Sequence, residues 1–124
     1  MSKLVRDIDI TDENKYLIFI DLLGIYKPYS LLRKREKEVF AMLLEIYNKY
    51  PNLDVVDRNK LTIGYDSRQA ISDKLGVSKF VVYNIMTELK DKQLIIESET
   101  KNDIINPKYA IPDLESITFN FITK

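Results

Sequence analysis

The sequence predicts a mainly helical α+β fold, in which three helices precede a small β-hairpin and apolar segments extend the chain at both ends. Apolar side chains recur three and four residues apart in residues 31–50 and 79–92, as on the buried face of a helix. Between two helical segments, residues 75–78, "LGVS", have the composition of a tight turn. Two β-branched runs then surround residues 100–103, "TKND", which favours a hairpin.

The composition excludes several classes of function. The 124 residues suffice for one hydrophobic core but not for two. The chain contains neither cysteine nor histidine, which excludes disulfides, thiolate and imidazole metal ligands and the usual general base. We therefore expect no metal, no cofactor and no enzymatic activity. Because no stretch approaches the roughly 20 apolar residues of a membrane span, and the N-terminus lacks the apolar centre of a signal peptide, we expect a cytoplasmic protein without a membrane partner.

The charge balance argues against a nucleic-acid partner, although not for every part of the chain. The formal net charge is zero, with 19 basic and 19 acidic residues, whereas nucleic-acid-binding proteins are usually basic. The charges are unevenly distributed, however, because residues 31–50 contain five basic and three acidic side chains. A local basic surface is therefore compatible with the balanced total.

The first third of the chain contains a polar arm, an apolar segment and a long helix. Residues 1–15 are polar and predict a loose arm, and residues 16–26, "YLIFIDLLGIY", fit either a strand or a short helix. Pro28 then breaks the chain. Residues 31–50 predict the first long helix, and its buried stripe consists of Val39, Phe40, Leu43, Ile46, Tyr47 and Tyr50.

The middle of the chain predicts a polar connection, a short strand and a helix. Residues 52–60 are mostly polar, and residues 61–64, "LTIG", are typical of a short strand. A second helix is expected to begin near Asp66, whose carboxylate would form a capping box with Gln69. Gly76 is expected just past the end of that helix, in the left-handed conformation.

A third helix is expected over residues 79–92, with Ser78 as its N-cap. Its inner face consists of Val82, Ile85, Met86 and Leu89. Gln93 stands where glycine commonly ends such a helix, so it must adopt a left-handed conformation or the chain must leave the helix differently. The hairpin follows over residues 95–110, and the alternating tail "SITFNFITK" predicts one more half-buried strand.

This order of elements resembles the winged helix-turn-helix family of DNA-binding domains. The similarity is strongest in residues 67–96, which contain "SRQAISDKLGVSKFVVYNIMTELKDKQLI", and "KREKEVFAMLLEIY" is similar to the family's first helix. The resemblance covers residues 31–110 and implies that this part forms the winged domain. Residues 1–30 would then be an N-terminal arm and apolar segment available for dimerisation, and residues 111–124 a C-terminal strand or tail.

The resemblance implies a sequence-specific protein for duplex DNA, most simply a transcriptional regulator that acts as a homodimer. The helix at about 79–92 would enter the major groove, and the wing at about 95–110 would contact the backbone. Ser67 and Arg68 suit phosphate contacts, since free amides at a helix N-terminus attract anions. The full set of implied DNA-contacting residues is Ser67, Arg68, Ser78, Lys79, Phe80, Tyr83, Asn84, Thr87, Lys101, Asn102 and Lys108.

Within this set, Asn84 is the best candidate for reading a base, because its amide can pair with both acceptor and donor of adenine. Thr87 and Phe80 suit a thymine methyl group, and Lys79 suits a phosphate or a guanine edge. The three wing residues would add backbone contacts. Each of these side chains also has a simpler interpretation as ordinary solvated surface, or, for Phe80 and Tyr83, as a packing surface for another protein.

Several residues depart from a typical DNA-binding surface and keep other functions open. Glu88 and Asp91 lie near the far end of the third helix, and the wing is acidic, which weakens the electrostatic attraction to phosphates. One alternative is a protein-binding winged helix without nucleic acid, anchored by Phe80 and Tyr83. Another is a replication initiator or a phage DNA-packaging adaptor, since "IINPKY" after the wing resembles small plasmid initiators and the Lys-, Asn- and Ile-rich composition is typical of phage or plasmid proteins.

Overall fold

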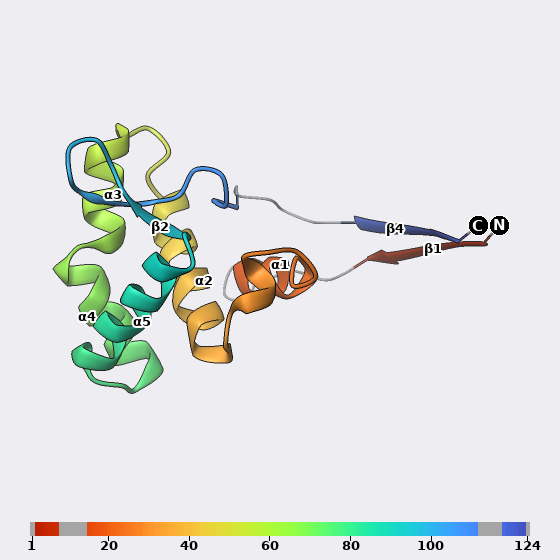
Figure 1. Ribbon diagram of the computed structural model, residues 1–124, viewed down its shortest axis with the longest axis horizontal. Coiled ribbons are helices and arrows are strands. Elements are labelled where there is room, and N and C mark those ends of the chain that lie inside the picture. The colour runs from red at the N-terminus through yellow and green to blue at the C-terminus, as the bar shows by residue number, and fades with distance from the viewer. Residues whose placement is uncertain (1, 8–14, 112–117, 124) are drawn as a thin grey trace.

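The computed structural model describes residues 2–7, 15–111 and 118–123 of the chain. These residues form five α-helices, one 3₁₀ helix and two separate antiparallel pairs of strands (Figure 1). The mainly helical α+β class predicted from the sequence is confirmed. In chain order the elements are β1 (Ser2–Asp7), α1 (Lys15–Leu22), η1 (Tyr29–Leu31), α2 (Lys34–Asn48), α3 (Val55–Ile63), α4 (Tyr65–Leu75), α5 (Lys79–Asp91), β2 (Ile95–Glu97), β3 (Asp103–Ile105) and β4 (Thr118–Thr123).

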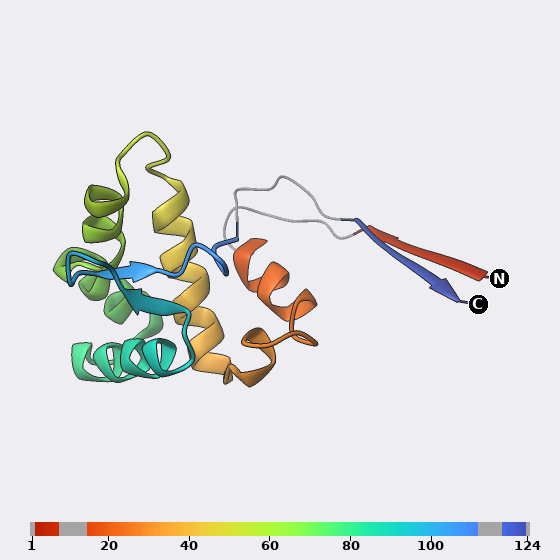
Figure 2. The same ribbon diagram turned by 45° about the horizontal axis from the view of Figure 1, so that its top comes forward.

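Helix α2 is the centre of the fold, with α1 on one side and α3, α4 and α5 on the other (Figure 2). Its predicted stripe is buried at Val39, Phe40 and Leu43. The stripe ends before Tyr50, which is exposed because the helix stops at Asn48. The apolar segment at 16–26, which the sequence left between strand and helix, begins as helix α1 and buries Phe19 against the same core.

A partly buried ion pair fixes the N-terminal end of α2 to the C-terminal end of α5. The Lys92 ammonium donates a hydrogen bond to the carboxylate of Glu36, which is only 3% exposed. The backbone N–H of Arg33 donates to the same carboxylate oxygen at 2.9 Å. Burial alone would raise the pKa of Glu36, but these hydrogen bonds and the positive charge of Lys92 together hold that pKa below its usual value.

The prediction for residues 52–64 is wrong, because helix α3 occupies Val55–Ile63 in place of a polar connection and a strand. Asp54 starts this helix by accepting a hydrogen bond from the Asp57 amide at 2.8 Å. The side chains that α3 buries most deeply, Asn59 and Thr62, are polar. A helix is predicted from apolar side chains that recur with a helical period. Because the inward side chains of α3 are polar, this pattern is missing from its sequence.

The hairpin is confirmed, with Ile95 opposite Ile105 and Glu97 opposite Asp103. Its open edge lies against α3, where the amide oxygen of Asn59 accepts a hydrogen bond from the Ile105 N–H at 2.8 Å. The same Asn59 donates to the Val55 carbonyl at 2.8 Å, so its buried amide is bonded at both ends. This side chain therefore attaches the hairpin to the helical body.

The two ends of the chain pair with each other. Strands β1 and β4 run antiparallel, with Leu4 opposite Phe121, and their ribbon extends away from the helices (Figure 1). The predicted tail strand is confirmed at Thr118–Thr123. The prediction that this strand is half-buried falls on side chains that the structure does not describe. The prediction of a loose arm for residues 1–15 is wrong at Ser2–Asp7, which forms strand β1. The two paired segments are more than a hundred residues apart, and local sequence patterns do not show such a pairing. Within the described part of the chain, no helix has both the length and the apolar character needed to cross a membrane.

Candidate nucleic-acid interface

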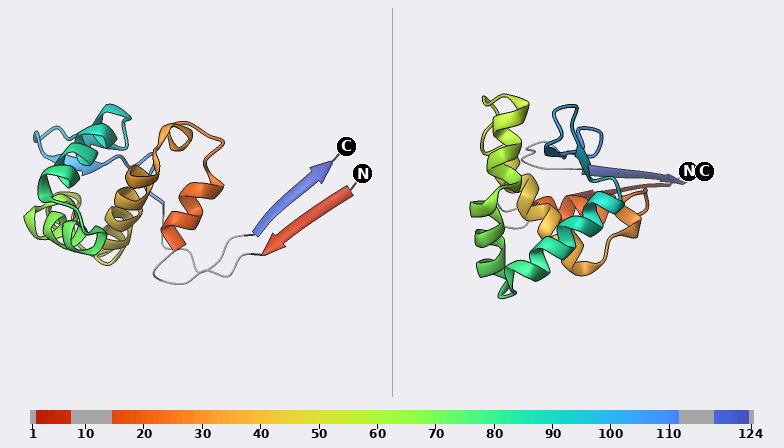
Figure 3. Two further views of the ribbon diagram at one scale, coloured as in Figure 1. Left: turned by 90° about the horizontal axis from the view of Figure 1, so that it is seen from below. Right: turned by 60° about the vertical axis from the view of Figure 1, so that its left-hand side comes forward.

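The turn between α4 and α5 follows the sequence prediction and sets the direction in which α5 faces. Gly76 adopts the left-handed conformation with φ of 66°, and the Ser78 hydroxyl accepts a hydrogen bond from the Val81 amide at 3.2 Å. The two helices meet at this turn and diverge from it (Figure 3). The Ser78 hydroxyl therefore caps α5, and we assign this side chain a structural role in place of the predicted DNA contact.

Helix α5 hides one face and presents the other to solvent. Val82, Ile85, Met86 and Leu89 are buried, as predicted. The opposite face consists of exposed side chains, with Phe80 exposed by 71% and Tyr83 by 57%. Lys79, Phe80, Tyr83, Asn84 and Thr87, the candidate residues of this helix, all lie on this open face. The Thr87 hydroxyl donates to the Tyr83 carbonyl at 3.2 Å, so its methyl group is the part most available for contacts.

A hollow of about 210 Å³ lies between the N-terminal turns of α4 and α5, and three aromatic and two basic side chains line it. We call it the aromatic hollow; its residues are Tyr65, Arg68, Lys79, Phe80 and Tyr83. The Lys79 ammonium stands 4.3 Å from the centre of the Tyr65 ring and donates a hydrogen bond to the Tyr65 hydroxyl. Within the described residues, the buried Arg68 Nε has no hydrogen-bond partner.

Gly64 allows α4 to begin close to the end of α3, and this places Tyr65 in the hollow. A side chain at position 64 would put its Cβ 2.3 Å from the Lys60 carbonyl oxygen. Helix α4 therefore starts at Tyr65 with Gly64 as its N-cap, and the predicted capping box of Asp66 and Gln69 is wrong. The amide of Gln69 instead donates to the Asp73 carboxylate at 2.8 Å.

The position of Ser67 corrects its predicted phosphate contact. Its side chain is buried, and its hydroxyl donates a hydrogen bond to the Leu61 carbonyl in the preceding helix. The side chain is thus turned towards α3 and joins the two helices, while its neighbour Arg68 lines the aromatic hollow. We therefore leave Ser67 out of the interface.

A second basic element, which the sequence reasoning did not single out, lies on the other side of α5. Arg33, Lys34 and Arg35 at the start of α2 form one wall of an open groove of about 450 Å³. The remaining lining residues belong to α2 and α5: Glu36, Val81, Asn84, Ile85 and Glu88. Only the excess of basic residues in 31–50 could have indicated this wall, because its position beside α5 depends on tertiary packing. Asn84 is thus adjacent to a cationic edge.

Of the three hairpin residues predicted to contact DNA, two have exposed side chains and the third is used within the turn. Lys101 and Lys108 are exposed, but Asn102 uses its side chain within the turn, donating to the Thr100 hydroxyl at 3.0 Å. The Lys90 ammonium forms a 3.0 Å ion pair with Asp103, and this hydrogen bond raises the pKa of Lys90. The acidic charge that faces α5 from the hairpin is therefore partly balanced by α5 itself.

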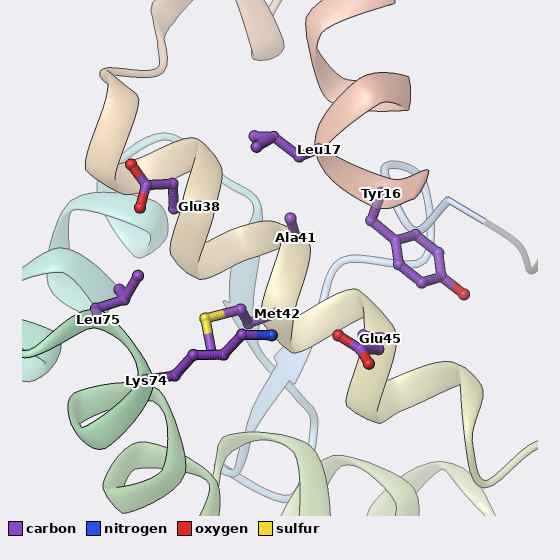
Figure 4. Close-up of a pocket in the computed structure, with 8 residues that line it drawn as sticks. All are labelled: Tyr16, Leu17, Glu38, Ala41, Met42, Glu45, Lys74 and Leu75. Carbon is purple, nitrogen blue, oxygen red and sulfur yellow. The ribbon is translucent and has the colours of Figure 1, made fainter. Parts of the chain in front are cut away.

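A further hollow of about 130 Å³ lies between α1, α2 and the end of α4 (Figure 4). Its floor is apolar, with Ala41, Met42 and Leu75, and Lys74 and Glu45 approach it from opposite sides. It shares no lining residue with the aromatic hollow or with the groove beside α2. It is a gap between packed helices with charges of both signs, and it lacks the grouped cations that lie beside α5.

Comparison of the chain with protein-family models, curated proteins and solved structures found no match. An exposed helix face of polar and aromatic side chains lies between two sets of basic residues, one from α4 and α5 and the other from α2.

Proposed function

We propose that this protein is a winged helix-turn-helix domain that binds duplex DNA, with α5 in the major groove and the β2–β3 hairpin as the wing. The order α2, α4, α5, β2, β3 supports this, because it is the order of the family that the sequence resembles. Helix α3 departs from the family pattern, since it stands where a short strand is expected. The observation that carries the proposal is the open face of α5 between two sets of cations.

If α5 entered the major groove, a DNA backbone would pass on each side of the helix. The major groove is about 12 Å wide, so a helix inside it has a phosphate backbone on each side. Arg68 and Lys79 would contact one backbone, and Arg33 and Lys34 the other. Asn84 would then face the base edges and is the residue proposed to read adenine.

We further propose a regulatory role in transcription for a homodimer, working in the cytoplasm as a binding protein and not as an enzyme. Glu88 lines the same groove as Arg33, and its negative charge lowers the affinity for DNA that one copy can reach. Two copies on adjacent half-sites would compensate for this. The β1–β4 ribbon supports self-association, because an isolated two-stranded sheet is marginally stable and gains from pairing with further strands.

The salt dependence of binding to random-sequence duplex DNA tests the proposal. If Arg33, Lys34, Arg68 and Lys79 each neutralise one phosphate, log K should fall with log [salt] with a slope of about −3.6, or roughly 150-fold between ~50 and ~200 mM salt. Replacing Arg33 and Lys34 by Gln should halve that slope. Lys49→Gln, which removes an exposed charge at the far end of α2, is the matched control and should leave the slope unchanged.

A protein partner is the second candidate, and the exposed rings of Phe80 and Tyr83 favour it. Aromatic side chains are enriched among the residues that dominate protein interfaces. This candidate predicts no binding to duplex DNA even at low salt, where a DNA-binding surface with four cations must bind without sequence preference. The same titration therefore separates the two candidates.

A further inference from the structure

The aromatic hollow contains more ring surface than contacts to a closed duplex can use. The rings of Tyr65, Phe80 and Tyr83 all line one hollow and are all more than half exposed. In a closed duplex the bases present only their edges to a groove, because their faces are stacked on neighbouring bases. An exposed ring face can gain much more from the face of a base that has left its stack.

The hollow also offers positive charge to a ligand that carries a phosphate. Arg68 and Lys79 line the same space as the rings, so a base against the rings would bring its phosphate towards both cations. A phosphate oxygen there would accept charge-assisted hydrogen bonds from the Lys79 ammonium and from the Arg68 guanidinium.

The size of the hollow limits the occupant. Its volume of about 210 Å³ is below the roughly 300–1,000 Å³ of sites for drug-sized ligands, so it suits one base-sized group. The exposed rims formed by Phe80 and Tyr83 leave room for the chain on either side to continue along the protein surface. These are the properties of a site for a single nucleotide within a longer strand.

We propose that the aromatic hollow binds one unpaired nucleotide of DNA, with the base against the rings and the phosphate between Arg68 and Lys79. This inference rests on the proposed DNA-binding function and specifies its substrate as DNA with a locally opened or bulged position. Such positions arise wherever a duplex is melted. The hollow would then act together with the rest of the α5 face, which contacts the adjoining duplex.

Four labelled DNAs of equal length and sequence context test the inference by fluorescence anisotropy. They are a perfect duplex, a duplex with one bulged thymine, the same bulge without its base, and a single strand. One stacked base should favour the bulged duplex over the perfect duplex by about tenfold, within the range known for base–aromatic stacking. The abasic bulge should lose this preference, because it keeps the phosphate and the bend but offers no base.

Two substitutions and a control connect the preference to the hollow. Tyr83→Ala should abolish the preference for the bulged thymine, whereas Tyr83→Phe, which keeps the ring, should retain it. Tyr26→Ala is the matched control, since Tyr26 is exposed by 60% and does not line the hollow, and it should change nothing. Circular dichroism of each variant confirms that the helices are intact.

The outcomes separate this inference from the function on which it rests. Equal affinity for perfect and bulged duplexes, or a preference that survives Tyr83→Ala in a folded protein, overturns the nucleotide site and leaves duplex binding in place. A preference shared by the abasic bulge shows recognition of bent DNA instead, and also overturns it. Failure to bind any of the four DNAs at low salt overturns both proposals and points to a protein partner for the rings.

Discussion

Replacing Glu36 by Gln tests the contact that holds α2 and α5 together and thereby places Arg33, Lys34 and Arg35 beside the open face of α5. Breaking a fully buried ion pair by removing one partner costs about 3–5 kcal/mol. The Glu36 side chain is 4% exposed, but that of Lys92 is 18% exposed and can regain water once its partner is neutral. We therefore expect Glu36→Gln to lower the free energy of unfolding by about 2–3 kcal/mol at pH 7, somewhat below that range.

The pH dependence of this loss follows from the direction of the pKa shift. The pKa of Glu36 in the folded protein lies below its ordinary value of 4.5. The stabilisation is therefore complete above about pH 4.5 and is lost as the pH falls through the folded-state pKa. Glu36→Gln removes the titrating group, so the difference between variant and wild type should shrink in the same window.

Urea unfolding followed by circular dichroism at pH 7, 5 and 3.5 measures both effects. Glu45→Gln is the matched control, because Glu45 forms only an exposed ion pair at 3.9 Å with Lys49 and should cost less than about 0.5 kcal/mol. If Glu36→Gln differs from wild type by no more than this control at pH 7, the ion pair does not hold the two helices together, and the reasoning is refuted.

Three further predictions concern single side chains. Asn59→Ala leaves the buried Ile105 amide without an acceptor and should cost about 1–3 kcal/mol in urea unfolding; a neutral result would show that the hairpin does not depend on this contact. Ser78→Ala removes the cap of α5 and should cost about 0.5–2 kcal/mol, whereas an unchanged midpoint would argue against capping. In DNA binding, Asn84→Ala should reduce discrimination at one base pair by about 1–3 kcal/mol, while Arg68→Ala weakens all sequences alike; indistinguishable effects would contradict the assigned roles.

Features determined by neighbouring residues could be predicted from the sequence. The left-handed Gly76, the Ser78 cap and the inner face of α5 all depend on spacings of a few residues. Gln93 adopts the left-handed conformation with φ of 67°, one of the two options that its place at the helix end allowed. Because a helix that buries one face must expose the other, the open face of α5 could be predicted from the same spacing.

Features that depend on distant contacts or on buried polar groups could not be predicted. Helix α3 buries Asn59 and Thr62 through hydrogen bonds, so its inward face does not register as apolar. The β1–β4 pairing and the place of Arg33 beside α5 join segments far apart in sequence. Ser67 was misassigned because a hydroxyl that bonds a carbonyl in the preceding helix has the same sequence signature as one that faces solvent.

Backbone amide NMR shifts, recorded while a short duplex is added at low salt, would test most directly whether the outward side of α5 meets DNA. Binding there should move the signals of residues 79–87 together with those of 33–35 and 65–68. Shifts confined to the terminal ribbon or to α1, or no shifts at all at millimolar duplex, would contradict a DNA-binding role for this surface.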